Sequence, residues 1–157
     1  MNGPAGIVRA AGAEDLDEIV ALDPLARAGD ATRVCLLTHA VGAGQCLVHV
    51  HDDGVTGLAI TKPRHFFGRD FVELLGVAPA ARRSGVGRRL LQAVVGAPGT
   101  LDVFTSTNES NAAMRALLAS EGWRLSGRLG GLDDGDPELV FFTRRARRTP
   151  LVPSGRP

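Results

Sequence analysis

The segment VELLGVAPAARRSGVGRRLLQAVV, residues 72–95, constrains the fold of this chain more than any other. It begins as an apolar run typical of a central strand and ends as an amphipathic helix. A helix that begins near Gly85 points its first unpaired amide groups into the preceding turn, with the positive end of its dipole behind them. Because Gly85 and Gly87 let a ligand approach the backbone closely, the turn is predicted to bind phosphate or pyrophosphate.

Two common nucleotide-binding loops do not fit this turn. A Walker loop ends in Gly-Lys-Ser/Thr, which is absent here. A Rossmann turn needs a third glycine and a later acidic residue for the ribose, and both are missing. Glycine pairs also occur at helix starts that bind nothing, so the turn alone leaves both interpretations open.

The rest of the chain predicts short helices and hairpins around this unit. The strand–helix–strand unit from Val72 to Thr105 requires a right-handed parallel crossover. Elsewhere the two-residue period and Gly/Asp turns predict antiparallel hairpins, so the fold class is mixed α/β to α+β. We expect one domain over residues 1–146 and a C-terminal tail over 147–157. The other predicted helices cover 14–22, 30–41 and 108–121, and the other strands cover 7–10, 45–51, 55–61, 71–77, 100–105, 124–132 and 138–144.

Composition excludes several classes of function. Eighteen basic and 17 acidic residues nearly cancel, so no overall field attracts nucleic acid or an anionic membrane. No apolar run is long enough to span a membrane, and the start lacks the order of a signal peptide, which predicts a cytoplasmic protein. Cys35 and Cys46 are predicted to be reduced and buried. His49 and His51 share a strand face that we expect to be solvated, and no metal site is predicted.

Three motifs in order resemble the GNAT acetyltransferases. The turn reads Arg82-x-x-Gly85-x-Gly87, which is similar to the family's motif A. IVRAAGAEDLDEIVALD resembles its opening strand and helix, and NESNAAMRALLASEGW resembles its motif B. The resemblance runs from Ile7 to Arg144. It implies a twisted, mostly antiparallel mixed sheet of six to seven strands flanked by about four helices, and acetyl-CoA as co-substrate.

The resemblance also implies which residues hold acetyl-CoA. The amides of the turn would bind the pyrophosphate, the end of the strand would bind the pantetheine arm and thioester, and motif B would contact the pantetheine. In the family, two strands splay apart and the acetyl group lies in the gap; here they are residues 72–77 and 100–105. The implied cofactor-binding residues are Leu75, Gly76, Val77, Arg82, Arg83, Ser84, Gly85, Val86, Gly87, Arg88, Asn111 and Met114.

The candidate catalytic residues are Glu73 and Ser110. Counting by two along a strand places Glu73 on the Val77 face, far enough away for a water to relay the proton of the amine. Some family members keep a catalytic glutamate here, but a Glu paired with a nearby cation or turned to solvent fits the sequence as well. Many members use a motif B tyrosine as the acid, where this chain has Leu118 and no tyrosine at all. Ser110, a water or no residue would then protonate the thiolate.

The acceptor implied by the resemblance is a primary amine of a small molecule or a peptide. The closing hairpin carries four acids, Asp133, Asp134, Asp136 and Glu138. They would either favour a cationic amine as the acceptor or simply form a solvated turn. His65, Phe66 and Phe67 would line a pocket or belong to the core.

Two further function classes stay open. One is an acyl-CoA-binding module without catalysis. The other is a transferase acting on aminoacyl-tRNA, which would use the arginines at 144, 145, 147 and 148, although we do not expect nucleic-acid binding. Homodimers occur in the family, but nothing in the sequence defines an interface.

Overall fold

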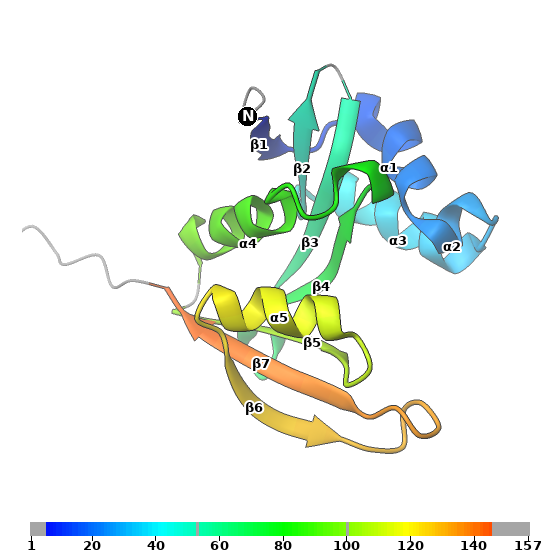
Figure 1. Ribbon diagram of the computed structural model, residues 1–157. Helices are drawn as coiled ribbons and strands as arrows, with labels where there is room; N and C mark the ends of the chain where they lie inside the picture. Colours follow the sequence, from blue (N-terminus) through cyan, green and yellow to red (C-terminus); the bar gives the residue numbers. More distant parts are fainter. Residues whose placement is uncertain (1–5, 53, 100, 146–157) are drawn as a thin grey trace, which may run out of the picture.

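A single seven-stranded sheet runs through the computed structural model, which describes residues 6–52, 54–99 and 101–145 (Figure 1). The strand order is β1-β2-β3-β4-β5-β7-β6. β4 and β5 pair in parallel, whereas the other neighbouring strands pair antiparallel. The strands are β1 (Ile7–Ala10), β2 (Cys46–His51), β3 (Gly54–Phe66), β4 (Arg69–Val77), β5 (Asp102–Asn108), β6 (Arg124–Leu129) and β7 (Glu138–Arg144).

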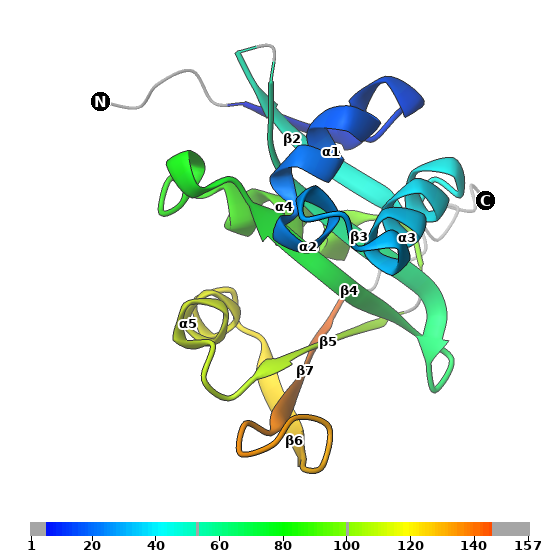
Figure 2. The same ribbon diagram turned by 90° about the vertical axis from the view of Figure 1, so that its right-hand side faces the viewer.

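Helices cover the sheet on both faces. α4 and α5 lie on one face, and α1 to α3 lie on the other (Figure 2). Leu90, Val94 and Leu118 are buried in a core under α4 and α5. Ile19 and Leu37 are buried in a second core under α1 to α3. The helices are α1 (Leu16–Leu22), α2 (Pro24–Arg27), α3 (Ala31–Gly42), α4 (Val86–Gly96) and α5 (Ala112–Ser120), with 3-10 turns η1 (Ala13–Asp15) and η2 (Pro79–Ala81).

The predicted fold class is confirmed, and so is the parallel crossover from β4 through α4 to β5. The helix expected over residues 30–41 is α3, and Asp30 caps it, since its carboxylate accepts a hydrogen bond from the Arg33 amide at 2.7 Å. Gly122 follows α5 with φ +76°, which is typical of a helix C-cap glycine, and Trp123 after it is buried. The predicted tail, residues 147–157, lies outside the described residues.

Some local predictions are wrong. The strand expected over residues 55–61 continues to Phe66, so the turn before β4 is confined to Phe67 and Gly68. The helix expected over 14–22 starts as the 3-10 turn η1, and α2 was not predicted at all. Cys35 is exposed rather than buried, because α3 buries Leu37 and Ala40 instead. Cys46 is buried as predicted, and burial raises the pKa of its thiol to about 11.

His49 is buried rather than solvated. His49 lies directly opposite Gly57 of β3, so the two residues share one face of the sheet. A Cβ on Gly57 would touch Val86 and Leu90 of α4. His49 therefore lies beneath α4, where its Nδ1 is 2.6 Å from the Thr56 hydroxyl and its Nε2 is 3.5 Å from Arg89. Burial, and after it the positive charge of Arg89, lower the pKa of His49.

A buried ion pair fastens the end of β7 to the start of β4. Arg145 Nη1 is 2.6 Å from Asp70 Oδ2, and both side chains are more than nine-tenths buried. The same guanidinium donates to the carbonyls of Val94 and Val95 at the end of α4. Arg145, one of the four arginines considered for a basic face, is therefore not available to such a face, because its guanidinium is buried against Asp70 and the end of α4.

We expect Arg145→Ala to lower the free energy of unfolding by about 3–5 kcal/mol, because it leaves the buried Asp70 carboxylate without this cation. Urea unfolding would measure the loss. Arg144→Ala is the matched control: Arg144 is exposed and lies 3.4 Å from Asp102, so its loss should cost about 1 kcal/mol or less. Equal losses in the two variants would contradict the assignment of Arg145 as the fastening residue.

Candidate active site

The two parallel strands separate in the middle of the sheet. β4 and β5 pair only from Asp70 to Val72 and from Val103 to Thr105. The last pair is reinforced by the Thr105 hydroxyl, which donates to the Val72 carbonyl at 2.9 Å. Beyond this point, within the described residues, β4 pairs only with β3 and β5 only with β7. A gap therefore opens inside the sheet from residue 73 onward (Figure 1).

The register shows which backbone groups face this gap. The Ala78 amide donates to the Thr56 carbonyl, and Val77 lies opposite Gly57. In an antiparallel pair, residues that bond across the ladder alternate with residues that bond outward. The amides and carbonyls of Leu75 and Val77 consequently point away from β3 and into the gap. An extended ligand arm in the gap could bond to them as another strand would.

The turn after β4 presents an open helix N-terminus. Gly85 is the N-cap of α4 with φ +88°, and no side chain among the described residues caps the helix. A Cβ at Gly85 would meet no heavy atom within 4 Å, so the protein leaves that space open. Arg83 also has a positive φ of 62°, and the Ser84 hydroxyl donates to the Ala81 carbonyl at 2.6 Å. Because the turn is held by its own bonds, the first amides of α4 stay directed outward.

The second glycine brings the two halves of the site together. A Cβ at Gly87 would lie 3.0 Å from Leu117 of α5, 3.7 Å from Val77 and 3.8 Å from Leu75. α4 therefore approaches both the gap-facing part of β4 and the helix α5. Met114 is partly buried against the same core.

The arginines around the turn have different environments. Arg82 and Arg83 are exposed and form no ion pair within the described residues. Arg88 is paired at 2.7 Å with Glu121, the residue that follows α5, and Arg89 lies 3.5 Å from His49. Of the four cations, Arg82 and Arg83 are therefore the ones with side chains available to an anion in the turn.

The start of α5 is fastened to the closing hairpin. Asn111 caps α5, because its Oδ1 accepts from the Met114 amide at 3.1 Å, and only its amide nitrogen is left for a ligand. The Ser110 hydroxyl and amide both donate to Asp136, at 2.5 and 2.9 Å. These bonds hold the pKa of Asp136 below its usual value. Asp133 in turn accepts from Asn108 at 2.8 Å. Two acids of the expected rim are therefore occupied in holding the hairpin.

Glu73 occupies a bulge, which changes the face that its side chain takes. Leu74 lies opposite Ile60, and Val72 lies opposite Thr61, so Glu73 is the extra residue between them. Val72, Leu75 and Val77 pack under α4 and α5, whereas Leu74 packs against the core of α1 to α3. The predicted common face of Glu73 and Val77 is therefore wrong, because one inserted residue reverses the alternation.

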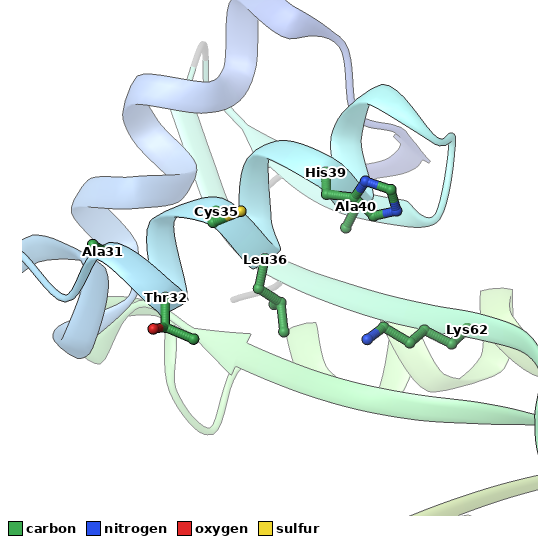
Figure 3. A pocket seen from close by; sticks show the side chains of 7 residues that line it. All are labelled: Ala31, Thr32, Cys35, Leu36, His39, Ala40 and Lys62. Carbon is green, nitrogen blue, oxygen red and sulfur yellow. The ribbon is translucent and has the colours of Figure 1, made fainter.

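On the α3 side, Glu73 pairs with a lysine. Lys62 Nζ lies 2.7 Å from Glu73 Oε2, and about a quarter of each side chain is exposed. Lys62 also lines a cavity of about 510 Å³ with residues of α3, which we call the α3 groove (Figure 3). Lys62 extends from β3 beneath the helix, with its ammonium directed toward Leu36. The other lining residues are Ala31, Thr32, Cys35, Leu36, His39 and Ala40.

Comparison with known proteins identifies the family. A sequence profile described as the Acetyltransferase (GNAT) family matches residues 14–123. A GNAT acetyltransferase structure from Bacillus cereus is 33% identical, with a TM-score of 0.84, and the match covers 90% of this chain and 99% of that one. The chain belongs to the GNAT acetyltransferase family. No curated protein sequence matches it significantly.

Two more distant structures share the GNAT fold. The protein yncA from Salmonella typhimurium, solved with acetyl-CoA, is 21% identical with a TM-score of 0.70, and the match covers 92% of this chain and 96% of that one. Diaminobutyrate acetyltransferase EctA from Paenibacillus lautus, solved with L-2,4-diaminobutyric acid and coenzyme A, is 19% identical with a TM-score of 0.70. That match covers 88% of this chain and 95% of EctA.

Lys62 is the residue of this GNAT site that sequence reasoning did not select. It is the only lysine in a chain with 18 basic residues, and that singularity was the available signal. His65, Phe66 and Phe67 do not line the α3 groove; Phe66 stacks on Phe71 at 5.4 Å, and Phe67 is 89% exposed. Within the described residues, no helix is long and apolar enough to cross a membrane, and no group of three or more potential metal ligands occurs.

We expect Ser110→Ala to raise the pKa of Asp136 part of the way toward its usual value, because the Asp136 carboxylate loses one of its two hydrogen-bond donors. A carboxyl group whose pKa is lower in the folded than in the unfolded state stabilises the fold at pH values above its unfolded pKa. This stabilisation is lost as the pH falls through the folded pKa. The stability difference between the variant and the parent should therefore vanish in acid. Carboxyl ¹³C NMR titration would follow Asp136, and urea unfolding would follow stability.

The matched control for this titration is Ser120→Ala, whose hydroxyl bonds only to the Leu117 carbonyl among the described contacts. It should leave Asp136 unchanged. An Asp136 titration that is identical in the parent and Ser110→Ala would show that the hydroxyl does not hold this carboxylate.

Proposed function

We propose that this GNAT protein transfers the acetyl group of acetyl-CoA to a primary amine of a small molecule or peptide, by direct attack on the thioester. The observation that carries the proposal is that an open helix N-terminus and an unpaired strand edge lie at the same end of β4. The turn suits a pyrophosphate, and the gap suits the extended arm attached to it. The coenzyme A and acetyl-CoA bound to the two distant relatives support the same cofactor here.

The cofactor-binding residues divide by the part of acetyl-CoA that they would hold. The backbone from Arg82 to Arg88, including Ser84, Gly85, Val86 and Gly87, would bind the pyrophosphate. Leu75 and Val77 would bond to the pantetheine through outward-facing backbone groups, with Gly76 between them. Asn111 would offer its amide nitrogen, and Met114 would pack against the arm. Asn111 and Met114 would use side chains that the fold also uses, since the Asn111 Oδ1 caps α5 and Met114 packs partly buried against the core.

The transfer itself requires a deprotonated amine and a polarised carbonyl. A backbone amide of the gap-facing edge would polarise the thioester oxygen as it becomes negative. Glu73 lies at the point where the strands separate and would take the amine proton, directly or through a water. The amine nitrogen then bonds to the carbonyl carbon, the carbon–sulfur bond breaks, and the thiolate leaves. With no tyrosine in the chain, and with Ser110 donating to Asp136, a water is the best candidate to protonate that thiolate.

Two alternatives fare differently. A transferase acting on aminoacyl-tRNA would need a basic face, but Arg145 is buried on Asp70, and residues 147 and 148 lie outside the described part of the chain. An acyl-CoA-binding module without turnover differs from the proposal only in its chemistry, so kinetics separates the two. The free cysteines Cys35 and Cys46 support the cytoplasm as the location.

We expect Gly85→Asn to weaken acetyl-CoA binding about tenfold or more, which calorimetry would measure. Asn tolerates a positive φ, so the loss of stability should be about 1 kcal/mol or less. Its side chain, however, would enter the open space over the first amides of α4. Gly29→Asn, at φ +90° and also free of contacts, is the matched control. Undiminished affinity in Gly85→Asn would remove the turn as the binding site.

We expect Glu73→Gln to lower turnover about 10²–10⁴-fold while acetyl-CoA affinity stays the same, because an amide cannot accept the amine proton. Release of coenzyme A with a panel of amines would measure turnover. Equal rates in the parent and the variant would exclude Glu73 as the base. Binding without turnover in the parent, for every amine tested, would favour the non-catalytic module.

A further inference from the structure

We propose that the amine acceptor carries a carboxylate and that Lys62 binds it in the α3 groove, so that the substrate is an amino acid or another small amino-carboxylic acid. The inference deepens the proposed function and depends on it. Lys62 is the only charged residue that lines this groove among the described residues. An anionic group entering the groove would meet this ammonium beneath α3 (Figure 3).

The distance between Lys62 and Glu73 defines the spacing of the two groups on the acceptor. Lys62 Nζ lies 2.7 Å from Glu73 Oε2, and Glu73 stands one residue beyond the last β4–β5 pair. A carboxylate held by Lys62 therefore lies close to the start of the gap. A short acceptor could bind Lys62 with its carboxylate while its amine reaches Glu73 and the thioester.

Exchange of ion-pair partners explains why a carboxylate should be required. An amine that binds Glu73 as an ammonium competes with Lys62 for that carboxylate. An acceptor without an acid would leave the largely buried Lys62 ammonium unpaired, and an unpaired buried charge is costly. A zwitterion replaces both partners at once, its ammonium facing Glu73 and its carboxylate facing Lys62. No charge is then left uncompensated.

Two of the four acids of the closing hairpin already accept hydrogen bonds within the protein. Of the hairpin carboxylates, Asp133 accepts from Asn108 and Asp136 accepts from Ser110. No acid lines the α3 groove within the described residues. Of the Lys62–Glu73 ion pair, only Lys62 lines the groove, so a group bound there meets the ammonium. This favours an anionic group over the second ammonium of a polyamine.

The size and lining of the groove indicate the rest of the acceptor. About 510 Å³ is in the range of small-molecule sites and leaves room for a side chain beyond the amine and carboxylate. Leu36 and Ala40 offer apolar contact. Thr32 and His39, about two helical turns apart on the same face, offer hydrogen bonds. A small or medium amino acid fits this combination.

Matched pairs of acceptors that differ only in the α-carboxylate would test the inference. Suitable pairs are alanine with ethylamine, ornithine with putrescine, lysine with cadaverine, and phenylalanine with phenethylamine. We expect kcat/KM, measured by coenzyme A release, to be about 10–100-fold higher for the amino acid of each pair than for the amine without the carboxylate. A factor of this size corresponds to one hydrogen bond between charged groups. Lys62→Met should abolish this preference, and Lys62→Arg should restore much of it.

The matched control is Arg64→Met, which removes a cation two residues along β3 that does not line the groove. It should keep the preference of the parent. Equal kcat/KM within the pairs for the parent protein, or a preference that survives in Lys62→Met, would overturn the inference. Calorimetry with acetyl-CoA separates failure of this inference from failure of the proposed function. If the protein binds acetyl-CoA but acetylates no amino-carboxylic acid, only this inference is contradicted. If it does not bind acetyl-CoA, the proposed function is contradicted.

Discussion

The short parallel pairing of β4 with β5 is the constraint on which the rest of the site depends. Two parallel strands in one sheet normally satisfy each other along their whole length, because an unpaired backbone group in the interior is costly. Here the ladder ends after Val72 and Thr105, and the groups of Leu75 and Val77 are left facing a gap. The fold tolerates this because both strands have another partner, β3 on one side and β7 on the other. The missing hydrogen bonds are what a bound extended ligand could supply.

The bulge at Glu73 follows from the same constraint. β4 pairs with β5 through Val72 and then has to turn away from it while staying on β3. An inserted residue bends and twists a strand, so a bulge at this position achieves the separation. It also places Glu73 on the α3 side, opposite the helix that begins at the proposed phosphate-binding turn. One local distortion thereby separates the proposed cofactor side from the proposed acceptor side.

The sequence predicted the elements well where periodicity and turn chemistry are strong. The central strand, the turn from Arg82 to Gly87, α4 and β7 all lie within a few residues of their expected positions. Prediction failed where a single residue changes the phase, as at Glu73, because nothing in the residue types marks a bulge. It also failed for charges: Arg145 and Asp136 look like solvated surface residues in the sequence, yet one is buried in an ion pair and the other holds a helix start. Counting charges does not show which are already paired in the fold.

The placement of the two proposed binding sides bears on the order of events in the reaction. The turn and Gly87 lie on the α4 and α5 side, and Lys62 lies on the α3 side. A thioester in the gap is then reachable from the α3 side while its pyrophosphate stays on the helix, so neither substrate has to leave before the other arrives. Such an arrangement favours a ternary complex with direct transfer over an acyl-enzyme. Cys35, the one nucleophilic thiol lining the α3 groove, is exposed on α3 rather than held at the start of the gap where Glu73 and Lys62 meet. In the proposed mechanism the acceptor amine therefore attacks the thioester directly, while the protein positions it and Glu73 takes its proton.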